Sequence, residues 1–162
     1  MPIILLDYPD PDIIRVEDTY YMITTTMHFF PGGQILSSKN LLEWHHESYL
    51  YDILDDNDQQ KLLSNNIYGQ GMWAACIRYH QGSFYVIFSA NDTQKTYLFK
   101  SNQIKGPWSK MTIPGFYHDP SLLFEDDKVY IIYGNSEIKI RELDLATFKP
   151  KSNIRTLITG EN

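Results

Sequence analysis

Hydrophobic and polar residues alternate along most of the chain in short runs that are rich in β-branched and aromatic side chains. This period-2 pattern is typical of β-strands with one buried face. Strands are predicted at 20–26, 84–88 and 129–133, after polar turns of hairpin length at 16–19, 80–83 and 125–128. The Asp-rich segment 53–64 has room for a helical turn, but we expect it to be an inserted loop. The pattern therefore predicts an all-β chain.

The predicted strands belong to copies of one unit, which begins at a key residue, continues through a hairpin and ends at an aromatic side chain. The units cover roughly 8–50, 70–115 and 117–150 within one domain, 1–162. Their key residues Asp10, Trp73 and Asp119 precede a strand tyrosine by 11, 12 and 11 positions. Repeats of about 45–60 residues made of short strands are typical of a β-propeller.

Three such units do not close a ring, because propellers have about 4–8 blades. The sequence therefore predicts an incomplete propeller of about three blades. Segment 154–162 shows no capping signal, so we expect the chain to be the N-terminal part of a longer catalytic domain. Open blade edges and apolar blade faces favour self-association, and we expect the isolated chain to be non-monomeric.

Composition narrows the classes of function. With 43% hydrophobic and 14% aromatic residues, the 162-residue chain has enough apolar material for a folded core, which excludes a disordered protein. The net charge of −6, with no basic run, argues against nucleic acid and against an anionic membrane surface as partners. No apolar run approaches the ~20 residues that a membrane helix needs.

Cysteine and histidine usage also excludes several kinds of site. The single cysteine, Cys76, cannot form an internal disulfide, and we expect a buried thiol. The five histidines lack metal-ligand spacing, so no metal site and no cofactor are predicted. The N-terminal segment lacks the basic region and apolar length of a signal peptide, which favours the cytoplasm. A secreted chain whose signal had been removed would have the same sequence.

The key residues of the units are the candidates for chemistry. The first strand of each propeller blade lines the central channel, so Asp10, Trp73 and Asp119 are expected to converge there. Two carboxylates can flank a sugar bond, with one of them activating water, and an indole face can stack on a pyranose. The alternatives are an Asp that accepts backbone N–H groups in its turn and a Trp that packs in the core.

A loop after the first hairpin supplies further candidates for sugar binding. His28, Phe29 and Phe30 are expected to rim the channel mouth, where aromatic side chains suit a small sugar pocket. His118, directly before Asp119, is a candidate for a hydrogen bond to a substrate hydroxyl. For both histidines a simple surface position is the alternative.

At these residues the sequence resembles glycoside hydrolase family 43, the five-bladed propeller β-xylosidases and α-L-arabinofuranosidases. The matching segments are 8–13, 30–41 with Trp44, 71–74 and 118–122, and the resemblance runs from about residue 3 to 149. It implies inverting hydrolysis of xylosidic or arabinosidic bonds in plant-polysaccharide oligosaccharides, with no cofactor. The stretch from Phe30 to Leu41 indicates the β-xylosidase-like branch.

The resemblance also implies roles. Asp10 is similar to the general base, Asp119 to the carboxylate that raises the pKa of the general acid and orients it, and Trp73 to the wall of the first sugar subsite. The family's general acid, a Glu followed by Gly, has no counterpart after Asp119, so the resemblance implies that it lies outside this chain and that the chain alone is inactive. Two residues also depart from the family pattern. Met27 stands where family members often have an aromatic side chain in the pocket, and Asp12 replaces the usual Ser after Asp-Pro.

Two other classes stay open from the sequence. The related fructan hydrolases retain the anomeric configuration, but their first- and third-blade motifs differ from Pro-Asp-Pro-Asp and His-Asp-Pro as found here. A carbohydrate-binding or self-associating fragment without turnover is the alternative outside the enzymes.

Overall fold

The computed structural model describes residues 4–160. The predicted domain 1–162 and the resemblance beginning near Ile3 therefore extend slightly outside the described residues. Twelve strands and no helix occur in the described part, which confirms the all-β prediction. Segment 53–64 is a loop, as expected.

The strands form three antiparallel sheets, each a meander of four strands in chain order. The first sheet contains β1 (Asp12–Val16), β2 (Thr19–Ile23), β3 (Gly32–Ser38) and β4 (His45–Tyr51). The second contains β5 (Met72–His80), β6 (Ser83–Ala90), β7 (Lys95–Ser101) and β8 (Ser109–Ile113). The third contains β9 (Ser121–Glu125), β10 (Lys128–Tyr133), β11 (Glu137–Leu143) and β12 (Arg155–Thr159).

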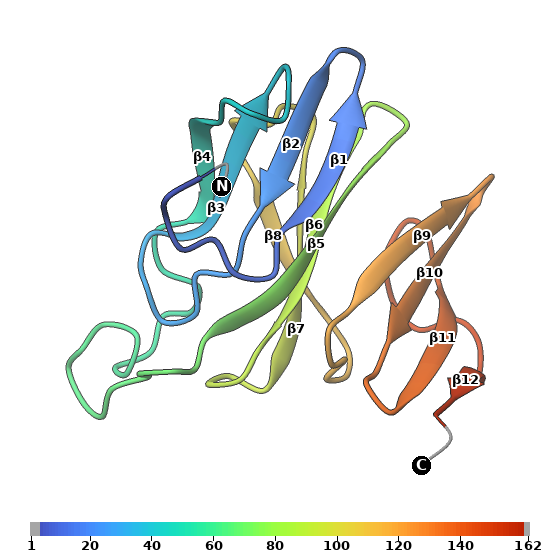
Figure 1. Cartoon of the computed structure of the whole chain (residues 1–162). Helices are drawn as coiled ribbons and strands as arrows, with labels where there is room; N and C mark the ends of the chain where they lie inside the picture. Colours follow the sequence, from blue (N-terminus) through green and yellow to red (C-terminus); the bar gives the residue numbers. More distant parts are fainter. Residues whose placement is uncertain (1–3, 161–162) are drawn as a thin grey trace.

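The sheets follow one another like the blades of a propeller (Figure 1). Their first strands are neighbours, since β1 contacts β5 and β5 contacts β9. This arrangement confirms an incomplete propeller of three blades. The third blade is longer than the predicted unit 117–150, because β12 pairs with β11 beyond residue 150.

The middle blade is buried on both faces, because a blade packs on each side of it and successive side chains of its strands point to opposite faces. Ile77 and Phe88 face the first blade and join one core cluster, while Cys76 and Ile87 face the third blade and join the other. All eight residues of β6 are buried. Two apolar cores between three blades therefore hold the molecule together. Cys76 is buried as expected, and burial raises the pKa of its thiol.

The aromatic residues that end each unit occupy equivalent places. Trp108 of the second blade packs against the core shared with the first blade, and Phe148 of the third blade is buried in the core shared with the second. Trp44 of the first blade has no blade beyond it in the described structure. It lines an apolar groove with Ile13 and Leu41.

Residues 4–160 contain no helix with the length and apolarity that a membrane span requires.

Candidate active site

Three residues that open the inner strands share an unusual backbone conformation. Asp10, Ala74 and Asp119 have φ values of 47°, 39° and 46°, in the left-handed region that non-glycine residues seldom adopt. Each lies two residues before a residue that pairs with the second strand of its blade, namely Asp12, Cys76 and Ser121. The three positions are therefore structurally equivalent, and such strained positions cluster at functional sites.

This equivalence corrects the sequence alignment of the second unit, which placed Trp73 beside the two aspartates. A bulge in β5 sets two residues, Ala74 and Ala75, against the single residue Phe88 of β6, between the pairs of Trp73 and Cys76. Ala74 precedes Tyr85 by 11 positions, as Asp10 precedes Tyr21 and Asp119 precedes Tyr130, so the spacing of 12 results from counting from Trp73. Trp73 thus comes one residue before the equivalent position, which Ala74 occupies.

The carboxylate of Asp10 is exposed and is held from one side by Thr25. The Thr25 hydroxyl donates to Asp10 Oδ2 at 3.0 Å and accepts the Ala74 N–H at 2.8 Å. Thr25 itself is only 5% exposed. A single buried hydroxyl therefore connects the candidate base of the first blade to the bulge of the second.

Thr25 was missed in the sequence, where 20–26 was predicted to be one strand. The structure ends β2 at Ile23, because the Thr25 N–H donates to the Pro9 carbonyl at 3.0 Å, outside the β2–β3 ladder. The signal that could have found this residue is the run of three threonines at the end of an otherwise aromatic and aliphatic strand.

Asp119 has a different partner. Its Oδ2 lies 3.3 Å from Nδ1 of His118, and the two side chains are 51% and 54% exposed. The His118 carbonyl accepts the Gly134 N–H at 2.9 Å, which anchors the turn before β9. Within residues 4–160 neither Asp10 nor Asp119 accepts a backbone N–H through its carboxylate, so the turn-capping alternative does not describe either one.

Trp73 is 42% exposed and lies outside both core clusters, unlike Trp108. An indole with a free face can stack on a sugar ring. Its position one residue before the Ala74 turn keeps it next to the Thr25 hydroxyl contact. The sugar-platform role stays a prediction.

The loop after β2 carries the other predicted binding residues, which do contact one another. The His28 and Phe29 rings lie 4.4 Å apart, and Phe29 is 65% exposed. Phe30 turns inward instead and packs edge-on against Tyr51. His28 and Phe29 therefore present a surface, while Phe30 anchors the loop to the core.

Tyr68 completes this surface and was not predicted. Its ring lies 4.7 Å from that of His28, and it is 80% exposed. The next N–H, from Gly69, donates to His28 Nδ1 at 3.1 Å and links this loop to His28. Tyr68 stands in the long loop before Trp73, where the sequence offers no periodic signal to single it out.

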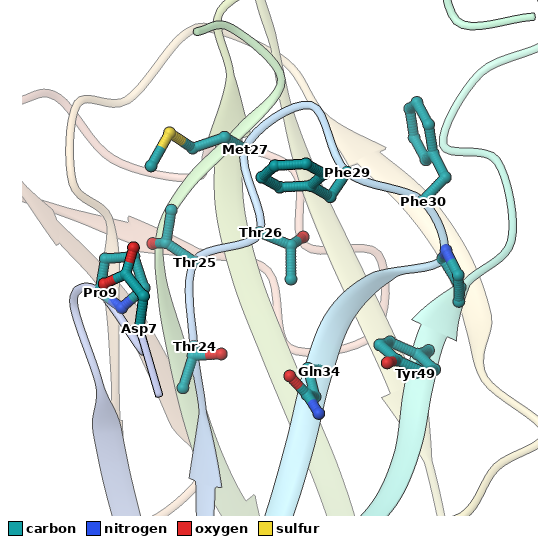
Figure 2. A pocket seen from close by; sticks show the side chains of 11 residues that line it. Asp7, Pro9, Thr24, Thr25, Thr26, Met27, Phe29, Phe30, Gln34 and Tyr49 are labelled. Atoms are coloured by element: carbon teal, nitrogen blue, oxygen red, sulfur yellow. The ribbon is translucent and has the colours of Figure 1, made fainter. Parts of the chain in front are cut away.

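A cleft of about 320 Å³ lies beside these elements (Figure 2). Phe29 and Phe30 line one side, Gln34 and Tyr49 project from β3 and β4, and the N-terminal segment closes it with Asp7. Pro9 and Thr25 line the cleft, but Asp10, Trp73 and Asp119 do not. The cleft thus reaches the neighbours of Asp10 and contains two of the predicted binding residues. His118 belongs to the third blade and is not part of it.

Within residues 4–160, no group of three or more His, Cys, Asp or Glu side chains is placed to hold a metal ion. His45 and His46 are exposed on β4.

Comparison with known proteins places these features in a family context. The family profile described as glycosyl hydrolases family 43 matches residues 1–162. A β-xylosidase of Formosa agariphila is 37% identical over 81% of this chain and 23% of its own length. A non-reducing end α-L-arabinofuranosidase of Bacteroides ovatus is 34% identical over 81% of this chain and 25% of its own length.

A solved structure titled as a bifunctional GH43-CE protein of Bacteroides eggerthii has a TM-score of 0.93 and 39% identity. The match covers 99% of this chain and 22% of that one. The chain thus spans about a quarter of the length of the relatives that it resembles.

Proposed function

Because the chain belongs to glycosyl hydrolases family 43, we propose that it forms part of the catalytic domain of an inverting glycosidase acting on xylosidic or arabinosidic bonds. The observation that carries this proposal is the pair Asp10 and Asp119. Both are half-exposed or exposed carboxylates at equivalent, left-handed positions at the start of inner strands. The names of the β-xylosidase and the arabinofuranosidase relatives support the two substrate classes.

In the proposed reaction Asp10 acts as the general base. It takes a proton from water while the water oxygen bonds to the anomeric carbon from the face opposite the leaving group. The bond between the anomeric carbon and the glycosidic oxygen breaks, and that oxygen receives a proton from a general acid. The hydroxyl of Thr25 holds the Asp10 carboxylate while leaving its other oxygen free for the water.

The general acid is proposed to come from outside residues 1–162, as the resemblance implies. Asp119 is proposed to orient it, and a second carboxylate nearby raises the pKa of such an acid by like-charge repulsion. That shift keeps the acid protonated near neutral pH, as the leaving group requires. His118, beside Asp119, is proposed to donate a hydrogen bond to a substrate hydroxyl.

The sugar is proposed to rest against aromatic side chains on the same side of the molecule. Trp73 offers a half-exposed indole, and the surface made by His28, Phe29 and Tyr68 lies on neighbouring loops. Apolar faces of this kind exclude water from one side of a pyranose. A xylo- or arabino-oligosaccharide is therefore the substrate class that we propose.

The test uses the protein encoded by the complete reading frame that contains residues 1–162. It is assayed with xylobiose and with aryl β-xylosides and α-L-arabinofuranosides. Asp10→Asn removes the base but keeps the size of the side chain, so kcat is expected to fall by about 10²–10⁴-fold. Asp18→Asn is the control, because Asp18 is an exposed carboxylate on the same blade, paired with Lys39 far along the hairpin.

Two results would contradict the proposal. One is an Asp10→Asn variant that keeps the wild-type rate, and the other is xylobiose binding in calorimetry with no release of xylose, which would favour a binding module. Proton NMR of the first-formed anomer tests the stereochemistry. A retained anomer would favour the fructan-hydrolase type of mechanism.

We also propose that the isolated 162-residue chain associates with a second copy through its two outer blade faces. The groove beside Trp44 on the first blade is equivalent to the sites where Trp108 and Phe148 meet the preceding blade. The third blade leaves Leu123, Leu157 and Ile158 exposed at the other end. The first blade of one copy is thus suited to pack against the third blade of another.

A further inference from the structure

Arg78 on β5 makes hydrogen bonds to the blades on both of its sides. Its Nη1 lies 2.7 Å from Asp12 Oδ2 on the first blade, and its Nη2 donates to Ser121 Oγ on the third at 2.9 Å. Its Nε donates to the Leu122 carbonyl at 3.1 Å. The planar guanidinium suits such a task, because its donors have a fixed fork geometry. Within residues 4–160, no other side chain hydrogen-bonds to both the first and the third blade.

The partners of Arg78 stand close to the two candidate carboxylates. Asp12 and Ser121 each come two residues after Asp10 and Asp119, and a proline separates each pair. The proline ring fixes φ, so little backbone freedom lies between a partner of Arg78 and its carboxylate. A shift of the guanidinium would therefore be passed to both ends of the site.

The partner on the first blade is also held firmly. Asp12 Oδ2 accepts the backbone N–H of Ile77 at 2.8 Å in addition to Arg78. Asp12 and Arg78 are about one-third exposed, so their pair is shielded from solvent more than Lys39 and Asp18 on the hairpin. Charge-assisted hydrogen bonds are roughly twice as strong as neutral ones. A serine at position 12, which the resemblance would suggest, offers no charge to the guanidinium.

We infer that Arg78 is a positioning residue that fixes the separation between Asp10 and Asp119 by tying the first blade to the third across the second. Inversion requires room for one water between the base and the sugar, so the spacing of carboxyl groups decides whether the attack is in line. The inference rests on the proposed function for its catalytic consequence. Its geometric part stands by itself and is tested separately.

The geometric test measures the distance between the first and third blades in the 162-residue chain, with the labelled chain diluted into an excess of unlabelled chain so that distances between copies do not contribute. Spin labels are attached at Asp18→Cys and Asp127→Cys, two exposed residues in the hairpin turns of these blades. Cys76 is buried and burial raises the pKa of its thiol, so it reacts poorly with the label. Pulsed electron spin resonance then gives the distance distribution.

A narrow distribution is expected, which becomes broader or shifts in Arg78→Met. Lys105→Met is the matched control, because the Lys105–Glu47 pair at 3.4 Å also joins two blades, but from the loop between β7 and β8 to β4, away from the inner strands. It is expected to leave the distribution unchanged. The inference is overturned by a distribution that is equally broad in the unaltered chain, or by one that Arg78→Met does not change.

The catalytic test uses the protein of the complete reading frame. Arg78→Met is expected to lower kcat by up to about 100-fold, the cost of a misplacement of about 1 Å, while KM stays within about twofold. Arg78→Lys keeps the positive charge opposite Asp12 but loses the second hydrogen bond, to Ser121. Its kcat should therefore lie between that of the unaltered enzyme and that of Arg78→Met. A merely structural role predicts a lower melting temperature with kcat unchanged for the folded enzyme.

The two tests separate the possible failures. If the unaltered enzyme hydrolyses neither xylosides nor arabinosides, the proposed function fails. The distance measurement still decides whether Arg78 holds the first and third blades at a fixed separation. If Arg78→Met alters the distance but leaves kcat unchanged, the positioning role is wrong.

Discussion

At the scale of the residue, the site depends on small polar contacts that a sequence pattern does not reveal. Thr25 is the clearest case, since its hydroxyl connects Asp10 to the backbone of Ala74. Asp12 is another, because its role as the partner of Arg78 depends on a residue 66 positions away. Asp10 and Asp119 could be singled out from the sequence because the repeat brings them into register, and Trp73 because it lies one residue before the equivalent position. Their partners could not, because those contacts exist only after the blades pack.

Thr25→Val tests the contact at Asp10. The substitution keeps the shape of the side chain but leaves the Ala74 N–H without an acceptor, which should lower the free energy of unfolding by about 1–3 kcal/mol. Urea denaturation of the chain measures this loss. In the complete enzyme kcat should also fall, because the Asp10 carboxylate loses its only side-chain donor in the described structure. Thr25→Ser retains the hydroxyl and should keep most of the stability and most of the kcat. A Ser variant as impaired as the Val variant would argue against a role for the hydroxyl contacts to Asp10 and Ala74.

At the scale of the element, hydrophobic periodicity predicted where the strands lie. It did not predict where they end or which residues depart from regular strand conformation. The strand 84–88 lies inside β6, and 129–133 lies inside β10. The strand 20–26 was too long, because Thr25 donates its N–H to Pro9 and contacts Ala74, and Thr26 contacts Met72, instead of continuing the ladder. The predicted alignment of the second unit was wrong by one residue, because it matched Trp73 instead of Ala74 to the two aspartates. An alanine side chain carries no chemical signal, so a pattern of residue types does not mark its equivalence to Asp10 and Asp119.

Gly71 tests the junction between the loop after β2 and the start of β5. It has a φ of +85°, and a Cβ there would meet the carbonyl of Met27, which accepts the Met72 N–H at 3.2 Å. Gly82 has a similar φ of +77° with open space around it. Gly82→Ala should therefore cost about 1–2 kcal/mol from the backbone alone. Gly71→Ala should cost clearly more in the same urea titration, and equal losses would show that the junction tolerates a side chain.

At the scale of the whole molecule, three blades enclose two cores and leave two outer faces without a neighbour in the described structure. The repeat of the sequence was enough to predict the propeller and its incompleteness. It was not enough to predict the length of the third blade, because β12 follows a segment without clear alternation and is exposed at every position. The spatial relation of the cleft to Asp10 also depends on how the N-terminal segment lies against the first blade.

The association of the isolated chain is measurable by light scattering over a range of concentrations. We expect a mass above that of the 19.0 kDa monomer, because the groove beside Trp44 and the exposed leucines of the third blade are apolar. Leu41→Lys places a charge in that groove and should shift the equilibrium toward the monomer. Thr112→Lys, at an exposed position of β8, is the control. A clean monomer at all concentrations would contradict the proposal.

The position of Ala74 in β5 has a consequence for how a repeated unit can acquire new chemistry. Ala74 fills the position that Asp10 and Asp119 occupy in their blades, and the residue two places later pairs with the second strand in all three. A change of residue type at this one position thus alters the chemistry of one blade without disturbing the strand pairing of the rest. A protein engineer would therefore introduce a third carboxylate at Ala74, whose backbone already has the conformation of Asp10 and Asp119, and not at Trp73.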